Sequence, residues 1–110
     1  MSTADDRFVA VAKRSQLREG RALRVRLDDD DIAVWLVRGE VYAVDNVCSH
    51  QHLPVIFRGT LADCTVTCPM HGWTYSLQTG QAVAGNGRIR TFRAKIEGDT
   101  LMIERPVPLW

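Results

Sequence analysis

Two short pairs of cysteine and histidine constrain this sequence of 110 residues more than any other feature. Cys48 and His50 flank one residue, whereas Cys68 and His71 flank two. Each pair is short enough for one tight loop to direct both side chains inward, and two facing loops would then offer two sulfur and two nitrogen ligands. The pattern therefore predicts a metal centre clamped between two loops.

Two metal groups suit this ligand set. Zinc binds two cysteines and two histidines, but a zinc finger usually places both cysteines before both histidines and carries the second pair on a helix. Here each loop mixes the two residue types, which suits a [2Fe–2S] cluster with two thiolates on one iron and two imidazoles on the other. Four-cysteine ligation is impossible within a chain that has three cysteines. The mixed pairs favour the iron–sulfur cluster and leave a zinc-stabilised binding module as the alternative.

The third cysteine, Cys64, makes the number of cysteines odd, which argues against a disulfide framework. The N-terminal sequence has neither the basic start nor the apolar core of a secretory signal. We therefore expect a cytoplasmic protein in which Cys64 is a buried free thiol that packs as a small apolar side chain.

The composition is that of an ordinary globular domain, with 45% hydrophobic and 25% charged residues. The formal net charge of +1 lacks the basic excess that is typical of nucleic-acid binding. The longest unbroken apolar stretch, Ile32–Val37, is too short to cross a membrane. We expect one domain spanning residues 1–110, with neither a nucleic acid nor a membrane as its partner.

Hydrophobic residues recur mostly with a period of two, which indicates β-strands. Apolar residues alternate with arginines along Leu23–Leu27, and the run Ile32–Val37 is apolar on both faces, as in a central strand. Gly39 and Gly98 each permit the positive φ that suits a hairpin turn. We expect strands at residues 8–12, 23–27, 32–37, 41–44, 92–97 and 100–104.

The stretch from about residue 45 to about residue 90 differs in kind, because it is rich in Gly, Pro, Asn and Thr and holds both Cys–His pairs. No segment of the chain has a convincing helical pattern. We therefore predict an all-β fold in which an antiparallel scaffold, about 1–44 and 91–110, carries an inserted loop-rich cluster-binding subdomain at about 45–90.

Several residues with conspicuous chemistry are expected to be structural or solvated only. The four consecutive aspartates Asp28–Asp31 indicate a solvated turn. His52 fits no ligand role once His50 is used, and Trp35 on its apolar strand is expected in the core. Solvated strand faces are expected for the basic residues Arg88, Arg90, Arg93 and Lys95.

The motifs CSH (48–50) and CPMHGW (68–73) resemble the paired motifs of Rieske iron–sulfur proteins. The longer stretch CPMHGWTYSLQTG (68–80) is most similar to bacterial Rieske ferredoxins and to the Rieske domains of ring-hydroxylating oxygenases. The resemblance extends from about Val41 to about Glu104. It implies a Rieske-type antiparallel β fold with one [2Fe–2S] cluster per chain.

Carried over to this sequence, the resemblance implies a complete ligand set. Cys48 and Cys68 would bind the inner iron, and His50 and His71 would bind the outer iron near the surface.

The resemblance also implies roles for residues around the cluster. Leu53 would form an apolar shield, and Trp73 and Tyr75 match aromatic positions that follow the second motif. The respiratory branch carries an extra cysteine in each loop, with Met70 at one of these positions here, and a serine where this chain has Trp73. Because fewer hydrogen bonds to the sulfurs leave the reduced cluster less stabilised, we expect a potential near the low end of the Rieske range, about −150 mV.

For function, the resemblance implies a ferredoxin component without bond chemistry of its own. It would take electrons from a flavoprotein ferredoxin reductase and pass them to a terminal oxygenase of aromatic hydrocarbon catabolism, as a monomer that makes transient redox contacts. The alternative is the small Rieske-like subunit of an assimilatory nitrite reductase, some examples of which lack the cluster ligands. All four ligand residues are present here, which favours the carrier.

Overall fold

The computed structural model describes residues 7–48, 53–70 and 72–105. Within these residues the chain forms strands and two short 3₁₀ helices, which confirms the all-β prediction. The strands are β1 (Phe8–Lys13), β2 (Ala22–Leu27), β3 (Asp30–Val37), β4 (Glu40–Asp45), β5 (Thr60–Ala62), β6 (Thr65–Thr67), β7 (Thr74–Ser76), β8 (Ala82–Ala84), β9 (Thr91–Phe92), β10 (Ala94–Glu97) and β11 (Thr100–Glu104), and the 3₁₀ helices are η2 (Arg14–Gln16) and η3 (Ile56–Arg58). In this described part, neither helix has the length or apolar character needed to span a bilayer.

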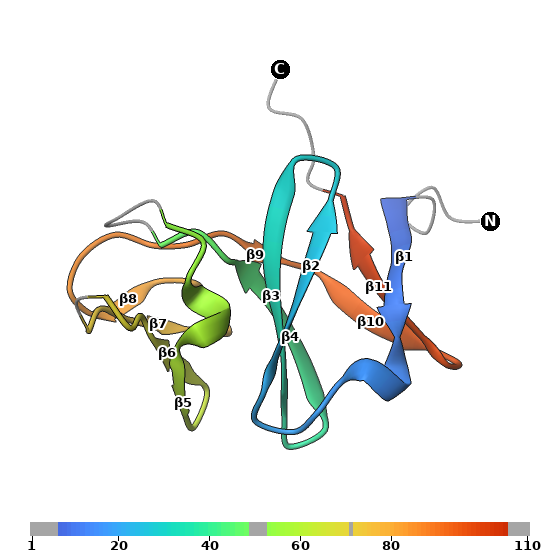
Figure 1. The fold of residues 1–110 in the computed structure, drawn as a ribbon, viewed down its shortest axis with the longest axis horizontal. Helices are drawn as coiled ribbons and strands as arrows, with labels where there is room; N and C mark the ends of the chain where they lie inside the picture. The colour runs from blue at the N-terminus through green and yellow to red at the C-terminus, as the bar shows by residue number, and fades with distance from the viewer. Residues whose placement is uncertain (1–6, 49–52, 71, 106–110) are drawn as a thin grey trace.

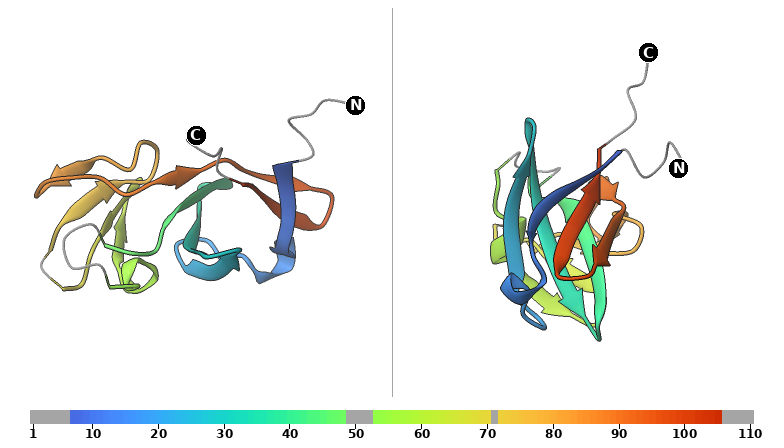
Figure 2. Two further views of the ribbon diagram at one scale, coloured as in Figure 1. Left: turned by 90° about the horizontal axis from the view of Figure 1, so that it is seen from above. Right: turned by 90° about the vertical axis from the view of Figure 1, so that its right-hand side faces the viewer.

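The strands form three antiparallel sheets, ordered β1-β11-β10, β2-β3-β4-β9 and β5-β6-β7-β8. The sheet β2-β3-β4-β9 lies in the middle, with β5–β8 at one end of the molecule and β1, β10 and β11 at the other (Figures 1 and 2). The β5–β8 sheet is formed entirely by residues between β4 and β9, so the chain leaves the middle sheet after β4 and returns to it at β9.

Strand β3 is buried on both of its faces because it lies between two hydrophobic clusters. Ala33, Trp35 and Val37 belong to the cluster that contains the two motif cysteines. Ile32, Val34 and Leu36 belong to a second cluster, with residues of β11. Successive side chains of a strand point to opposite faces, so a strand between two layers is apolar at every position. This arrangement confirms the predicted central strand and the predicted core position of Trp35.

One predicted strand differs from the structure. The alternating run 92–97 is not one strand, because Thr91–Phe92 pairs with β4 whereas Ala94–Glu97 pairs with β11. The chain therefore passes from one sheet to another at Arg93. The segment between β4 and β9 contains the four short strands β5–β8 and the helix η3, each of three residues, among its loops.

The acidic run Asp28–Asp31 is not simply a solvated turn, and that prediction is wrong for its second half. Asp30 and Asp31 begin β3, and only 12% of the Asp31 side chain is exposed. Carboxylates of the run pair with arginines from three different parts of the chain: Asp28 with Arg105 (2.9 Å), Asp30 with Arg90 (2.7 Å) and Asp31 with Arg24 (2.6 Å). The run therefore joins the start of β3 to β2, to the segment before β9 and to the end of β11.

Asp31 is the member of this run for which we predict a pH-dependent contribution to stability. The hydrogen bond from Arg24 lowers the pKa of Asp31 below its ordinary value of 3.8, and a hydrogen bond from Asn46 acts in the same direction. A carboxyl whose pKa is lower in the folded state stabilises the fold above its unfolded pKa and loses that contribution as pH falls through the folded pKa. Asp31→Asn should therefore lower the unfolding temperature most near neutral pH, with a difference from wild type that shrinks below pH 3.8.

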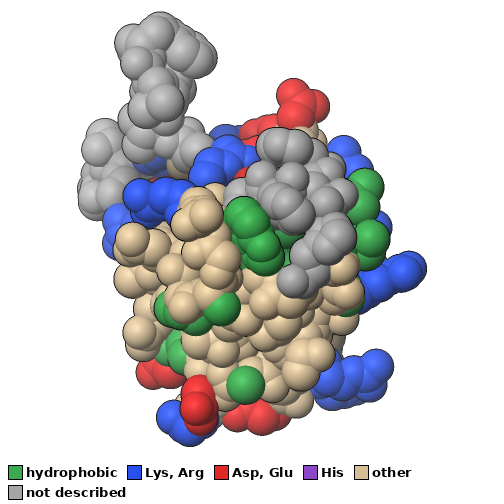
Figure 3. Space-filling model, turned by 90° about the vertical axis from the view of Figure 1, so that its left-hand side faces the viewer, with side chains coloured by type: hydrophobic (Ala, Val, Ile, Leu, Met, Phe, Trp, Pro, Cys, Tyr) green, Lys and Arg blue, Asp and Glu red, His purple; other side chains and the backbone are tan. Residues whose placement is uncertain are grey.

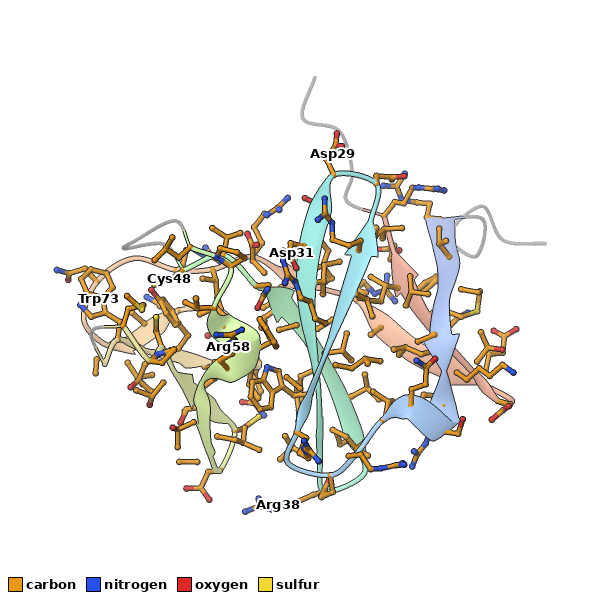
Figure 4. The ribbon with its side chains drawn as sticks, viewed as in Figure 1. Asp29, Asp31, Arg38, Cys48, Arg58 and Trp73 are labelled. Atoms are coloured by element: carbon orange, nitrogen blue, oxygen red, sulfur yellow. The ribbon has the colours of Figure 1, made fainter. Side chains whose placement is uncertain are left out.

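The measurement is thermal unfolding of both proteins from about pH 7 to about pH 3. Asp29→Asn is the matched control, because Asp29 is exposed at the tip of the same turn (Figure 4). A loss in Asp31→Asn that stays constant across this range would contradict the pairing of an ionised Asp31 with Arg24.

Candidate metal centre

The two motif cysteines are the described part of the predicted ligand set, and both are buried. Cys48 is 1% exposed and Cys68 is 2% exposed, and they belong to one hydrophobic cluster with Tyr75. His50 and His71, together with His52, lie outside the described residues. The structure thus brings together the sulfur half of the set, in the core beneath the end of the molecule formed by β5–β8.

The first motif begins a loop that closes on itself. The backbone N–H of Cys48 donates to the carbonyl oxygen of Leu53 (3.0 Å), and Val47 forms an isolated β-bridge with Pro54. The loop therefore leaves and returns at adjacent points, with Cys48 at its buried start.

The second motif forms the hairpin loop between β6 and β7, and it closes in the same way. The N–H of Cys68 donates to the carbonyl oxygen of Trp73 (2.7 Å), five residues ahead, as Cys48 does to Leu53. Gly72 has a φ of +75°, which suits glycine. Below the loop, the hydroxyl oxygens of Thr67 and Thr74 lie 2.9 Å apart across the strands. Each cysteine is thus the first residue of a loop of the same span.

Asn46 anchors the first loop to the scaffold, and the sequence analysis did not identify it. Its side chain is fully buried; the amide nitrogen donates to Asp31 (3.1 Å) and the amide oxygen accepts from the N–H of Phe57 (2.7 Å). The backbone N–H of Asn46 donates to the carbonyl oxygen of Asp31 (2.8 Å), and its own carbonyl oxygen accepts from Ile56 (3.1 Å). One buried residue, two positions before Cys48, therefore ties both ends of the loop region to β3.

Trp73 packs against Gly85. A Cβ atom added to Gly85 would lie 2.6 Å from an indole carbon of Trp73, and Gly85 has a φ of +94°. A larger residue at position 85 would therefore displace the indole. Trp73 lies at the end of the molecule away from the scaffold (Figure 4).

Two tyrosine hydroxyls lie beside cysteine side chains. The hydroxyl of Tyr75, which is fully buried, lies 3.5 Å from Sγ of Cys48. Tyr42 lies beside Cys64, and the hydrogen bond between them raises the pKa of Tyr42. Cys64 is only partly buried, at the edge of the same cluster, so the prediction of a buried thiol is wrong in degree.

Comparison with known proteins decides which metal group this geometry serves. Residues 7–93 match the family of the Rieske [2Fe-2S] domain. This chain is a member of the Rieske family. Its cofactor is accordingly a Rieske-type [2Fe–2S] cluster, and the zinc alternative is excluded.

Rieske ferredoxins are among the proteins most similar to it. The ferredoxin component of the naphthalene 1,2-dioxygenase system of Pseudomonas aeruginosa is 30% identical over 101 residues, which cover 90% of this chain and 96% of that protein. The fold matches the ferredoxin of carbazole 1,9a-dioxygenase from Nocardioides aromaticivorans IC177, with a TM-score of 0.84, 24% identity and coverage of 90% and 98%. It equally matches a chain described as an NADH-dependent nitrite reductase small subunit from Mycobacterium tuberculosis, with a TM-score of 0.84, 22% identity and coverage of 92% and 96%.

The described residues fit the thiolate half of a Rieske centre. Thiolate ligands of such a cluster need a site that excludes water and supplies hydrogen bonds to sulfur. Cys48 and Cys68 are both buried, and the hydroxyl of Tyr75 lies where it can donate to Sγ of Cys48. The serine that the respiratory branch uses for such a bond is replaced by Trp73, so Tyr75 is the side-chain donor that the described residues provide at Cys48.

We predict that Tyr75→Phe lowers the reduction potential by about 20–60 mV, which corresponds to one hydrogen bond of about 0.5–1.5 kcal/mol in a one-electron couple. The hydroxyl favours the reduced form because the thiolates are more negatively charged in that form. Potentiometric titration of the holoprotein measures the change. Tyr42→Phe is the matched control, because it removes a hydroxyl beside Cys64 rather than beside Cys48. Equal potentials for Tyr75→Phe and wild type would show that the Tyr75 hydroxyl does not act on the sulfur.

We also predict that Asn46→Ala destabilises the protein by about 1–3 kcal/mol, because it removes a fully buried amide and leaves the partly buried N–H of Phe57 without its acceptor. Iron should then be lost faster to a chelator, since the first loop is less firmly held. Chemical denaturation and the rate of iron release at one temperature measure the two effects.

Asn86→Ala is the control for Asn46→Ala, because Asn86 is exposed. A variant Asn46→Ala with wild-type stability and wild-type iron release would remove Asn46 from the support of the site.

Proposed function

We propose that this protein is a one-electron carrier whose cluster is held by Cys48, Cys68, His50 and His71. In this proposal the two cysteines bind the inner iron and the two histidines bind the outer iron. The observation that supports it most directly is the pair of buried cysteines, each at the start of a loop closed by the same backbone hydrogen bond. Each loop then carries one histidine, two positions after Cys48 and three after Cys68.

The cluster supplies the capacity to accept and release one electron. The protein supplies the environment. The buried side chains of Trp35, Ile56 and Val66 pack around the two cysteines and keep water from the thiolate end of the iron–sulfur cluster. Tyr75 donates toward Cys48, and Asn46 holds the first loop against β3. No described residue is needed for bond making or breaking in this role.

We further propose that the electron comes from a flavoprotein ferredoxin reductase and goes to the terminal oxygenase of a ring-hydroxylating system. The support is the identity of 30% to a ferredoxin component of a dioxygenase system over 96% of that protein's length. We propose that the protein acts as a monomer, because redox partners of this kind meet through small transient contacts.

The nitrite reductase alternative has support from the fold only. The similarity to the small subunit from Mycobacterium tuberculosis has the same TM-score as that to the carbazole 1,9a-dioxygenase ferredoxin, but both are under 25% identical. Sequence identity favours the ferredoxin component.

The ligand set is tested by matched single substitutions. His50→Ala and His71→Ala should abolish the visible spectrum and the electron paramagnetic resonance signal of the reduced cluster, because each removes a ligand. His52→Ala, in the same loop as His50, should keep both. Cys64→Ser should likewise keep the cluster that Cys48→Ser and Cys68→Ser lose. A full cluster spectrum in His50→Ala or His71→Ala would refute the assignment.

The carrier role is tested by reconstitution. The reduced holoprotein is mixed with terminal oxygenases and ring substrates, with NADH and a ferredoxin reductase as the electron source. Product formation that requires this chain supports the proposal. Isolation of the protein in a stable complex with a nitrite reductase catalytic subunit would instead establish the alternative.

A further inference from the structure

The cluster-binding part of the chain is almost without charge. Residues 46–87 include two charged residues, Arg58 and Asp63, although the whole chain has 14 basic and 13 acidic residues. The segments 46–57 and 64–87, which contain both ligand motifs, have none. The charge of this protein is therefore concentrated elsewhere.

The two exceptions lie toward the scaffold rather than at the cluster end. The guanidinium of Arg58 lies over the ring of Phe57 (5.4 Å), and Arg24 of β2 lies over the same ring (5.3 Å). Asp63 pairs with Arg38, which lies in the turn between β3 and β4 (3.4 Å). In the view of Figure 4, Arg38 lies well away from Trp73, and Arg58 lies between Trp73 and the middle sheet.

Exposed hydrophobic side chains show the opposite distribution. Among the described residues, the large hydrophobic side chains that are exposed are Leu53 (38%), Met70 (46%) and Val83 (63%). All three belong to residues 46–87, and Leu53 and Met70 lie in the two ligand loops. In Figure 3 the described part of this end is mostly hydrophobic side chains, uncharged side chains and backbone, with Lys, Arg, Asp and Glu side chains around its margin.

Several of the charged residues that flank this surface form ion pairs, and Arg88, directly after it, donates to the carbonyl oxygen of Thr79 (3.5 Å). Asp45, immediately before it, pairs with Arg90 (3.2 Å), which also pairs with Asp30. Arg93 lies 3.6 Å from Glu104. Arg90 and Arg93, which were predicted to lie on solvated strand faces, thus pair with carboxylates of the scaffold, and this pairing weakens the field with which they could steer an acidic partner.

Resting on the proposed function, we propose that this cluster end is a charge-free docking face for a redox partner whose own contact surface is uncharged. A partner charge of either sign that is buried against this face would lose its hydration without gaining a counter-ion, and binding would be weaker as a result. A neutral, apolar partner surface loses little and gains contact with Leu53, Met70 and Val83. Met70 adds an adaptable side chain that suits more than one partner in turn.

This face also sets the kinetics of docking. Without electrostatic steering, association proceeds at about 10⁵–10⁶ M⁻¹s⁻¹ and changes little with salt. Discrimination between partners then depends on which charged surfaces the face rejects.

The experiment introduces either sign of charge at one exposed position. Met70→Lys and Met70→Glu are compared with Met70→Gln, which is polar but neutral. Ser15→Lys and Ser15→Glu, at an exposed position in η2, control for net charge. The electron paramagnetic resonance spectrum of each variant verifies that the cluster is intact, and the same three substitutions at Val83 replace any Met70 variant that loses it.

Two probes report the result. The first is the rate of electron self-exchange between oxidised and reduced copies of the protein, which is measured by nuclear magnetic resonance line broadening. This reaction requires two such faces to come into contact. Isothermal titration calorimetry measures the affinity of the protein for a terminal oxygenase with which it supports turnover. For wild type, both quantities should change less than about twofold between about 0.02 M and 0.3 M salt.

Both Met70→Lys and Met70→Glu should weaken oxygenase binding by about tenfold or more, with little change in Met70→Gln and none in the Ser15 variants. Self-exchange should slow in each charged variant and recover when reduced Met70→Lys is mixed with oxidised Met70→Glu. Stronger oxygenase binding with one sign of charge, or a steep salt dependence of the wild type, would overturn the charge-free face. If no oxygenase accepts electrons from the protein, the proposed function fails. The self-exchange rates of the charged variants still test whether the face is charge-free.

Discussion

The two faces of β3 bury different side chains, and the layers on either side of the middle sheet pack against them. Ile32, Val34 and Leu36 pack with the terminal strands, while Ala33, Trp35 and Val37 pack with the residues that surround Cys48 and Cys68. Removing a large apolar side chain from such a strand costs about 2–5 kcal/mol. A substitution on the Trp35 face would therefore disturb the packing around the cysteines directly, because these residues belong to the same hydrophobic cluster.

The start of β3 adds a polar connection to the same loop. Asp31 accepts from Arg24 and from Asn46, and Asn46 in turn accepts from Phe57. Surface ion pairs contribute about 0–1 kcal/mol each, so the exposed pairs of Asp28 and Asp30 add little alone. Asn46 matters more, because its buried amide has a partner at both ends and the loss of either leaves a polar group unsatisfied. The packing of β3 places the site, and this short network keeps the first loop in register with it.

Much of this arrangement could be predicted from residue type and spacing. The two Cys–His pairs stand out because few chemistries need both types twice at short spacing, and the run Ile32–Val37 is apolar throughout because both faces are buried. The change of sheet at Arg93 could not be seen, since alternation continues from Phe92 to Ile96 whichever strand each residue pairs with. Strands of three residues, such as β6 and β7, are too short to show a period. The role of Asn46 is also hidden, because an asparagine after a strand usually indicates a turn and its partners lie 15 and 11 residues away.

The charge of the cofactor explains why such a neutral unit is compatible with it. In a Rieske centre two thiolates balance the charge of the oxidised iron–sulfide core and two neutral imidazoles add none, whereas four thiolates would leave an excess of negative charge. A buried negative cofactor would need nearby cations to offset its desolvation. The oxidised Rieske centre is neutral and needs only hydrogen bonds such as that of Tyr75, and the reduced centre carries one negative charge where a four-thiolate centre would carry three. The segments 46–57 and 64–87 can therefore omit charged residues at a smaller cost. The ligand chemistry thus permits the composition of the loops, and that composition in turn determines which surfaces can approach the cluster.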